Sequence, residues 1–473
     1  MSTIVEPESA QSRTERISGR SRGALLVLCG AIFLEGIDVA MLNVALPAIR
    51  AELGLSTTTL SAVVSAYVLG YAGFMLLGGR AADLFGRRRI FLLSLTVFIV
   101  FSGLGGLATN GWMLLVARFV TGLSASFMTP AGLSLITTNF PEGPQRNKAV
   151  LIYAGTAAAG FSLGLVASGL LTAISWRWVF FAPVILSAIL LALAPRLIVD
   201  TASTEGRPKF DFLGAITMCG AMLAAAFGVT RLERAAEDLD AALIAFAVSA
   251  ALWILFVIIE HGTRSPLVRL GIFRSAALIR ANLVTLLFAG SFFGFQFLAT
   301  IYLQELLRWT PLQTGAALLA IGIDSILAPT VTPWLVARFG NARVILGGLV
   351  FAAVGYGLFL RLSLDWTYAT MFPTMLLLGF AFSLAYGPLT IAATDGVAED
   401  EQGLASGLVN TAFQFGAALG LSAVSAISAV ILGADVAPDA RLEAIRAALL
   451  VPLAAAALGA LVMATGAARR QDK

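Results

Sequence analysis

The sequence predicts an all-α integral membrane protein with fourteen transmembrane helices, arranged as two related six-helix bundles with two additional helices between them. Composition gives the class, because the chain is 59% hydrophobic and only 12% charged, whereas a soluble globular protein carries about 25% charged residues. Segment length gives the element type, because stretches of about 20 apolar residues cross a bilayer as helices. An internal repeat gives the arrangement.

The expected spans follow one another along the whole chain, separated by short polar loops. They cover residues 24–47, 57–78, 90–110, 112–137, 150–174, 177–198, 212–231, 239–260, 282–305, 312–336, 343–363, 366–393, 404–433 and 447–467. The loop at 433–446 is expected to hold a short amphipathic helix outside the membrane.

The repeat relates the first six spans to the last six. Residues 126–164 resemble residues 383–420, because each stretch has a Pro in a helix, a polar loop and then a Gly/Ala-rich helix. Such repeats are typical of secondary transporters, which bind substrate near the bilayer midplane between the halves. We therefore divide the chain into a cytoplasmic tail, a first bundle, a linker with two additional helices, a second bundle and a second tail, covering 1–22, 23–198, 199–281, 282–467 and 468–473.

Basic residues indicate the orientation. Most of the 31 Lys and Arg residues lie in both tails and in alternate loops, and such loops face the cytoplasm. We therefore expect a multi-pass protein of the inner (cytoplasmic) cell membrane, embedded in the lipid bilayer, with both termini in the cytoplasm.

Several function classes are excluded by residues that the chain lacks. Its two Cys residues lie in apolar runs and it has a single His, so we expect neither disulfides nor a metal site. No basic stripe with interleaved aromatic residues indicates nucleic-acid binding, and no loop has the pattern of a nucleotide-binding motif. We expect no enzyme, no cofactor and no use of ATP, and we expect the chain to work as a monomer.

Four charged residues lie deep within apolar spans, away from the span ends. These are Glu35, Asp38, Arg118 and Asp324. Charged groups at this depth are costly and mark ion or substrate pathways, although they also form structural ion pairs between helices. A carboxyl group out of water can gain and lose a proton near neutral pH, so all four are candidates for proton coupling.

Depth suggests how these groups meet. At about 1.5 Å per residue, Asp38 and Arg118 both fall in the outer half of the membrane, where they can pair. Glu35 and Asp324 come from different halves of the chain and both lie near the midplane, as a central cavity requires. Asp38 and Asp324 are therefore candidate substrate ligands as well.

The stretch GGRAADLFGRRRIF (78–91) combines a tight turn with charged residues at fixed spacing. The pattern GxxxDxxGRRR resembles the loop signature of the major facilitator superfamily. GIDVAMLNVALP (36–47), LLVARFVTGLSASFMTP (114–130), SWRWVF (175–180) and YLQELLRWTPLQTG (302–315) resemble signatures of its fourteen-helix drug:proton antiporter branch, the multidrug efflux type. The resemblance covers nearly the whole chain and implies the major-facilitator fold.

The resemblance also implies roles for particular residues. The loop residues Gly79, Asp83, Gly86, Arg87 and Arg88 would form a cytoplasmic latch that pairs across the halves when the inner side is closed. Asp38 would couple protons and shape the substrate site, and the fixed charge of Arg118 would favour ionised carboxylates nearby. Asp324 matches an acid that some members use for cationic substrates.

One signature departs from the branch. In GFSLGLVASG (160–169) the usual Pro is replaced by Leu165 and a Gly by Ser168, so we expect no proline kink there, and the direction of transport stays open. Gly160, Gly164 and Gly169 are assigned to hinge formation or to close helix packing.

Aromatic and amide side chains complete the candidate substrate site. Phe293, Phe297 and Phe413 are candidates for lining an apolar cavity or holding a cation, with lipid contact or packing as the alternative. Asn43 and Gln304 lie within the quoted motifs and are included. Four Trp residues at span edges are expected to anchor in the membrane interface: Trp176, Trp178, Trp309 and Trp366.

The residues predict a helical transporter with two related halves. The resemblance implies a proton-coupled secondary transporter that uses the proton gradient as its energy source and exports small lipophilic drugs or metabolites, cations among them, by alternating access. Two alternatives remain. A proton symporter or uniporter for one metabolite fits the altered 160–169 stretch, and a membrane scaffold or sensor without transport is an alternative of another class. Buried charges argue against the scaffold, which has no need of them.

Overall fold

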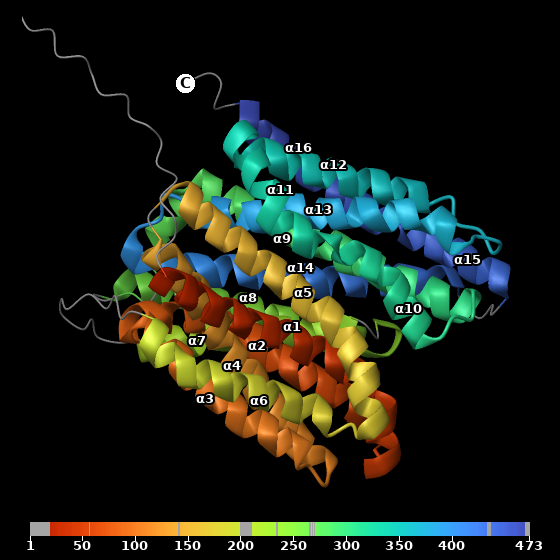
Figure 1. Ribbon diagram of the computed structural model, residues 1–473, viewed down its shortest axis with the longest axis horizontal. Coiled ribbons are helices and arrows are strands. Elements are labelled where there is room, and N and C mark those ends of the chain that lie inside the picture. The colour runs from red at the N-terminus through yellow and green to blue at the C-terminus, as the bar shows by residue number, and fades with distance from the viewer. Residues whose placement is uncertain are drawn as a thin grey trace, which may run out of the picture.

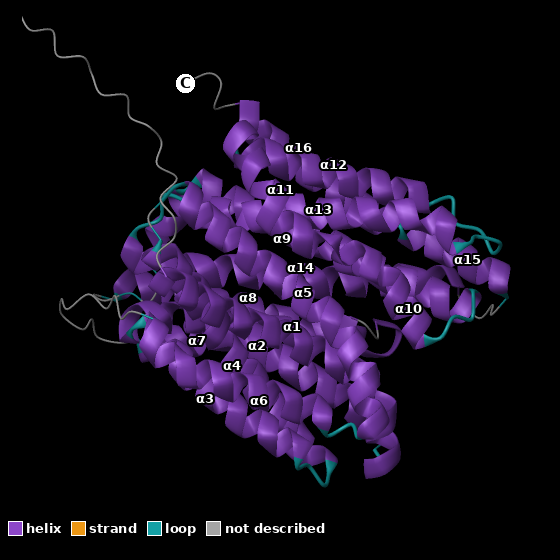
Figure 2. Cartoon of the chain, in the orientation of Figure 1, coloured by secondary structure: helices purple, strands orange, loops and turns teal. Residues whose placement is uncertain are grey.

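The computed structural model describes residues 19–468, except 56, 141, 199–210, 233–234, 264–265, 267, 269 and 433–436. In this part of the chain all regular elements are helices, and no strand occurs (Figure 2). They are α1(Gly19–Leu53), α2(Thr57–Phe85), α3(Arg87–Gly106), α4(Gly111–Asn139), α5(Pro144–Ile174), α6(Trp178–Leu197), α7(Phe212–Leu232), α8(Ala235–Gly262), η1(Leu270–Arg274), α9(Ala276–Ile301), η2(Tyr302–Leu306), α10(Pro311–Leu318), η3(Leu319–Ile323), α11(Asp324–Phe339), α12(Asn341–Phe359), α13(Tyr368–Thr394), η4(Glu399–Glu401), α14(Gln402–Leu432), α15(Pro438–Ala448) and α16(Leu450–Ala468).

The expected number of spans is confirmed. Thirteen described helical stretches are long and apolar enough to cross a membrane, and α5 makes a fourteenth when its two bent parts are counted as one span. The expected span 312–336 is divided into α10, the 3₁₀ segment η3 and α11. The short helix expected in the 433–446 loop is also present, as α15.

The two halves repeat the same helix pairings. In the first half α1 packs on α5, α2 on α4, and α3 on α6. In the second half α9 packs on α14, α11 on α13, and α12 on α16. The two bundles lie side by side, with most of the red-to-yellow helices of the first below the green-to-blue helices of the second, while the gold α5 crosses between these levels (Figure 1). The proposed domain boundaries stay a prediction.

The two additional helices pack beside the junction of the bundles. α7 pairs with α8 and also contacts α2 and α14. Leu223 of α7 lies against Gly73 of α2. Ser422 of α14 donates a hydrogen bond of 3.2 Å to the carbonyl of Val229 in α7. One helix therefore touches both halves.

Helix α5 bends although it has no Pro at the predicted kink position. Its parts Pro144–Gly164 and Val166–Ile174 meet at 40°, so the expectation that Leu165 leaves the helix without a kink is wrong. Close packing accounts for the bend, because glycines let backbones approach. A Cβ at Gly160 would lie 2.4 Å from the carbonyl oxygen of Phe33, and Gly164 packs on α1 as well.

Two further expectations about the first half need correction. Gly169 has no heavy atom within 4 Å of the place where a Cβ would stand, so it takes no part in helix packing. Trp176 is not an interfacial anchor, because only 2% of it is exposed. Its indole N–H donates to Glu52 at 2.8 Å, and its ring packs edge-on against Phe180. The polar partner within the protein explains why the indole is buried.

Candidate functional site

A cavity of about 240 Å³ lies between the two bundles. The first half lines it with α1, α2 and α5, and the second half lines it with α9, α10, η3, α11, α13 and α14. Most of the lining is apolar. The polar and charged lining side chains are Glu35, Tyr67, Tyr71, Ser162, Gln296, Asp324, Tyr386, Asn410 and Gln414. None of the described lining residues is a Lys, Arg or His.

Glu35 brings a carboxylate from α1 to the wall of this cavity. It accepts hydrogen bonds from two hydroxyl groups on other helices, those of Tyr71 on α2 and Thr129 on α4. Tyr71 also lines the cavity. The side chain of Glu35 thus joins three helices of the first bundle through neutral partners.

Asp38 lies one turn further along α1 and has a different partner. Its Oδ2 accepts a hydrogen bond of 2.6 Å from Nη1 of Arg118 on α4, which confirms the pairing expected from depth. Both residues are 2% exposed. The guanidinium carbon of Arg118 also lies 4.2 Å from the ring centroid of Tyr67. Asp38 is not among the cavity-lining residues.

Asp324 faces the cavity from the second half. It is the first residue of α11 and follows the 3₁₀ segment η3, where the α-helical pattern breaks. The residue is buried and lines the cavity. Its Oδ1 accepts a hydrogen bond of 3.4 Å from the Ser325 hydroxyl. Together Asp324 and Glu35 place one carboxyl group from each half on a single cavity.

Aromatic rings form the wall on the side of the second half. Phe293, Phe382, Tyr386 and Phe413 all line the cavity. The Phe413 ring lies 4.7 Å from Tyr386 and 5.7 Å from Phe293 between centroids. The first pair is tilted and the second is edge-to-face, and rings at these distances attract one another and give a firm apolar surface. The structure therefore places two of the predicted aromatic residues, Phe293 and Phe413, at the cavity.

Other candidate substrate ligands lie elsewhere. Phe297 packs against the apolar core of the second bundle, and Gln304 sits in the π-helical turn η2 beyond the end of α9. Neither lines the cavity. Their side chains belong to packing and to an outer turn, so the structure does not support them as ligands of this cavity. The side chain of Asn43 lies outside the described residues.

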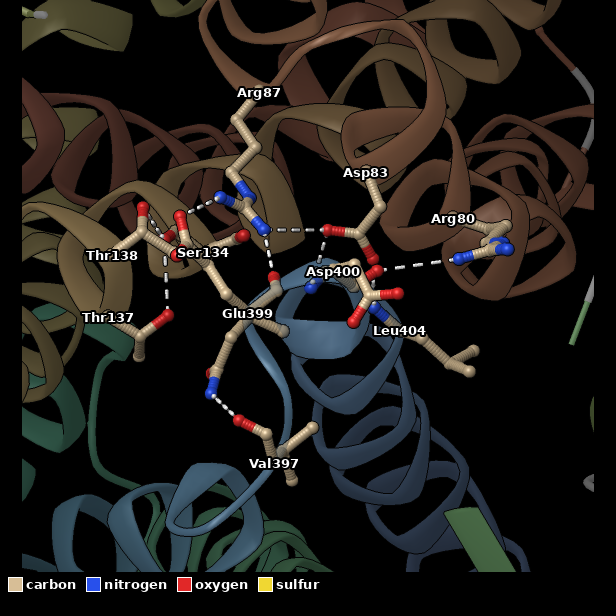
Figure 3. A network of polar contacts seen from close by, with 12 residues as sticks. Arg80, Asp83, Arg87, Ser134, Thr137, Thr138, Val397, Glu399, Asp400 and Leu404 are labelled. Atoms are coloured by element: carbon tan, nitrogen blue, oxygen red, sulfur yellow. Dashed lines mark hydrogen bonds and ion pairs between the residues drawn. The ribbon is translucent and has the colours of Figure 1, made fainter. Parts of the chain in front are cut away.

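The Asp83 loop closes one end of the junction. Asp83, near the end of α2, accepts hydrogen bonds from the backbone N–H groups of Gly403 at 3.0 Å and Leu404 at 3.1 Å (Figure 3). These N–H groups belong to the first turn of α14, where a helix favours a negative charge. The contact joins the first half to the second, as the resemblance implied.

Two arginines strengthen this latch. Arg87 pairs with Asp83 at 3.2 Å and donates to the backbone carbonyl of Glu399 in the other half (Figure 3). Arg80 reaches the carbonyl of Asp400 at 3.5 Å. Arg88 does not take part, because it is half-buried and donates to the carbonyl of Pro195 within its own half. The expected role of Arg88 in the latch is therefore wrong.

Glycines shape the same contact. Gly86 has φ 97° between α2 and α3, a conformation that other residues rarely adopt. A Cβ added at Gly79 would lie 2.3 Å from the carbonyl oxygen of Gly403. The two helices therefore touch through bare backbone beside the latch. At the far end, where α15 lies, the two bundles diverge (Figure 1).

A second contact across the halves was not predicted. Arg146, in the first turn of α5, is buried and donates to the carbonyl of Thr394 at 3.2 Å and to the side chain of Gln402 at 3.3 Å. Thr394 is the last residue of α13, where a cation is favourable. The end of the molecule that carries the Asp83 loop is thus tied together at two places.

The profile of the Major Facilitator Superfamily matches residues 28–421. The chain belongs to this superfamily. Membership makes it a multi-pass membrane transporter, and the fold agrees. The human organic anion transporter MFSD10, a solved member, superposes with a TM-score of 0.71 over 94% of this chain and 100% of its own, at 14% identity.

Two curated relatives are more similar in sequence. The puromycin resistance protein pur8 of Streptomyces alboniger is 34% identical over 412 residues, covering 85% of this chain and 81% of its own. The cephamycin export protein CmcT of Amycolatopsis lactamdurans is 32% identical over 432 residues, covering 90% and 88%. Both names describe resistance to an antibiotic or export of one.

Four polar residues that line the cavity were not predicted from the sequence. Tyr67 and Tyr71 are four residues apart on α2, and Asn410 and Gln414 are four apart on α14, so each pair shares one helix face. Polar pairs at this spacing inside apolar spans indicate an inward face. That signal is present in the sequence, although none of these four residues lies in the quoted motifs.

Proposed function

We propose that this chain exports small lipophilic drugs or metabolites, including cations, in exchange for protons by alternating access. One observation supports this most strongly. A single cavity between the repeat-related halves combines a carboxyl group from each half with an aromatic wall, and none of its described lining residues is basic. Such a cavity suits an apolar molecule that carries a positive charge.

The latch supports alternating access. One end of the junction is closed by Asp83 and Arg87, while the bundles diverge toward the other end. By the distribution of basic residues, the closed end faces the cytoplasm and both termini lie there. The state described is then the one that releases substrate outward. Rocking the two bundles about the cavity would break the latch and open the inner side.

Proton movement supplies enough energy for useful export. One charge crossing a potential of about 100 mV releases about 2.3 kcal/mol, which sustains a gradient of roughly fifty-fold. We also propose that the transporter works as a monomer in the cytoplasmic membrane, without a cofactor and without catalysing a reaction.

The direction of transport rests on the relatives and on α5. The altered 160–169 stretch was the reason to consider a symporter or uniporter, but α5 bends at that place without Pro. Relatives whose names state antibiotic resistance or export favour outward transport. We therefore keep proton-coupled export as the proposal.

Inside-out membrane vesicles test it. A proton gradient is imposed, ethidium or puromycin is added, and collapse of the gradient is followed with a pH-sensitive dye. We expect collapse with at least one probe for the wild type and a loss of at least ten-fold in rate for Asp324→Asn. Asp439→Asn, which removes an exposed carboxylate on α15, is the matched control. The proposal would be contradicted if the wild type bound neither ethidium nor puromycin and the proton gradient did not collapse with either.

A further inference from the structure

The two acids of α1 differ in the kind of hydrogen-bond partner they have. Asp38 is bonded to a guanidinium group, which can only donate. A protonated Asp38 could still accept the 2.6 Å hydrogen bond from Arg118 through an unprotonated oxygen, but it would leave a buried cation without a counter-charge, which is costly. The ion pair is therefore the stable arrangement of Asp38 and Arg118.

Glu35 has partners that allow both protonation states. The hydroxyl groups of Tyr71 and Thr129 donate to its two carboxylate oxygens. A hydroxyl group can also accept a hydrogen bond. When Glu35 carries a proton, the Tyr71 hydroxyl can accept it and donate instead to the Thr129 hydroxyl oxygen, which lies 3.4 Å away. The same three helices hold the side chain in either state.

The charged groups around Glu35 also distinguish it from Asp38. The titratable and charged groups that face it are Asp38 on α1, Tyr67 and Tyr71 on α2, Arg118 on α4, Tyr153 on α5, Tyr386 on α13 and Asp324 across the cavity. Arg118 is the one cation in this set, and it is bonded to Asp38. Within the described residues, Glu35 therefore has no cation of its own, although it opens on a cavity.

We propose that Glu35, and not the signature residue Asp38, is the group on which a proton and the cationic part of the substrate replace each other. The proposal rests on the proposed function. Asp38 and Arg118 are then positioning residues that form a fixed ion pair behind the cavity wall. An ionised Glu35 in this apolar wall needs a positive charge beside it. The proton or the cationic ligand supplies that charge, and one carboxylate cannot hold both.

Infrared difference spectroscopy tests the assignment without any substrate. Acidifying the reconstituted full-length protein should produce a carbonyl band from protonated buried carboxyl groups. We expect Glu35→Gln to lose a component of that band and Asp38→Asn to keep it, while Asp324→Asn identifies the contribution of the other cavity acid. The proposal would be overturned if the band component were lost in Asp38→Asn and kept in Glu35→Gln. Loss of the component in both variants would overturn it as well.

Two tyrosines provide a second readout in case Asp38→Asn does not fold. Tyr71→Phe removes a hydroxyl that contacts Glu35, whereas Tyr67→Phe removes one that has no hydrogen-bond partner in the structure. We expect the Glu35 band to shift in frequency in Tyr71→Phe and to stay in place in Tyr67→Phe. A band that moves with Tyr67 and not with Tyr71 would contradict the assignment.

Calorimetry with ethidium in two buffers of different ionisation enthalpy then counts protons released on binding. We expect about one proton per ethidium for the wild type and none for Glu35→Gln. If the wild type binds ethidium without proton release, the exchange at Glu35 is wrong. If it binds no probe at all, the proposed function fails instead, while the infrared result still decides which acid of α1 takes up the proton.

Discussion

Replacing Gly79 by Ala should open the inner side of the transporter. The Cβ would lie 2.3 Å from the carbonyl oxygen and 3.0 Å from the carbonyl carbon of Gly403. Non-bonded atoms prefer about 3.5–4.0 Å, so the two helices would have to separate by about 1 Å. The obstacle on both sides is backbone, which cannot turn aside as a side chain can.

The size of the effect follows from this overlap. Inserting a methyl group into a tight contact typically costs about 1–3 kcal/mol, and here the cost falls only on the closed state. That energy corresponds to a change of about 5-fold to 150-fold in the ratio of closed to open molecules. Export should slow as the outward-releasing state becomes rare.

Spin labels on the two bundles measure this ratio. Cysteines at Arg89 on α3 and Arg343 on α12 place labels on exposed residues of the first and second bundle. The Gly79→Ala variant should move population from the short to the long distance. Gly347→Ala is the matched control, because it makes the same change within α12 with no atom inside 4 Å. If both variants give the same distances, the closed state does not depend on the glycine contact.

Three further outcomes are expected. Asp83→Asn weakens two charge-assisted hydrogen bonds to the start of α14, worth about 1.5–3 kcal/mol each, so the long label distance should dominate; an unchanged distribution would contradict this. Asp38→Asn leaves Arg118 buried without its partner and should lower stability by about 3–5 kcal/mol, seen as a lower melting temperature in detergent that removing both charges partly restores. Phe413→Ala should weaken ethidium binding about ten-fold by removing a ring of the cavity wall, whereas Phe297→Ala should not; equal losses would refute the assigned wall.

The spans were predictable because each is long, apolar and separated from the next by polar residues. Their ends were less predictable. Helix α1 runs on to Leu53, beyond the predicted end at 47, and its last turn holds Glu52 against Arg177 at 3.0 Å. Contacts between distant parts of the chain set such ends, and a hydropathy pattern does not contain them.

The candidate site was predictable where a charge lay within lipid. Asp38, Arg118, Glu35 and Asp324 stood out because charges are rare in spans. The sequence could not show that Asp38 pairs with Arg118 while Glu35 opens on the cavity, because three residues on one helix separate the two acids by less than one turn. Only the packing of α2, α4 and α5 around α1 distinguishes them.

The contact between Gly79 and Gly403 also bears on how often the transporter can cycle. Fixing a long side chain in one rotamer costs up to about 1.5–2 kcal/mol of conformational entropy, and glycine has no side chain to fix. Where α2 and α14 come closest, closing the inner side therefore costs no side-chain conformational entropy, because the contact contains no side chain. The glycine contact provides close packing without this cost, and the side chains that lose conformational entropy on closing are the latch arginines, Arg80 and Arg87.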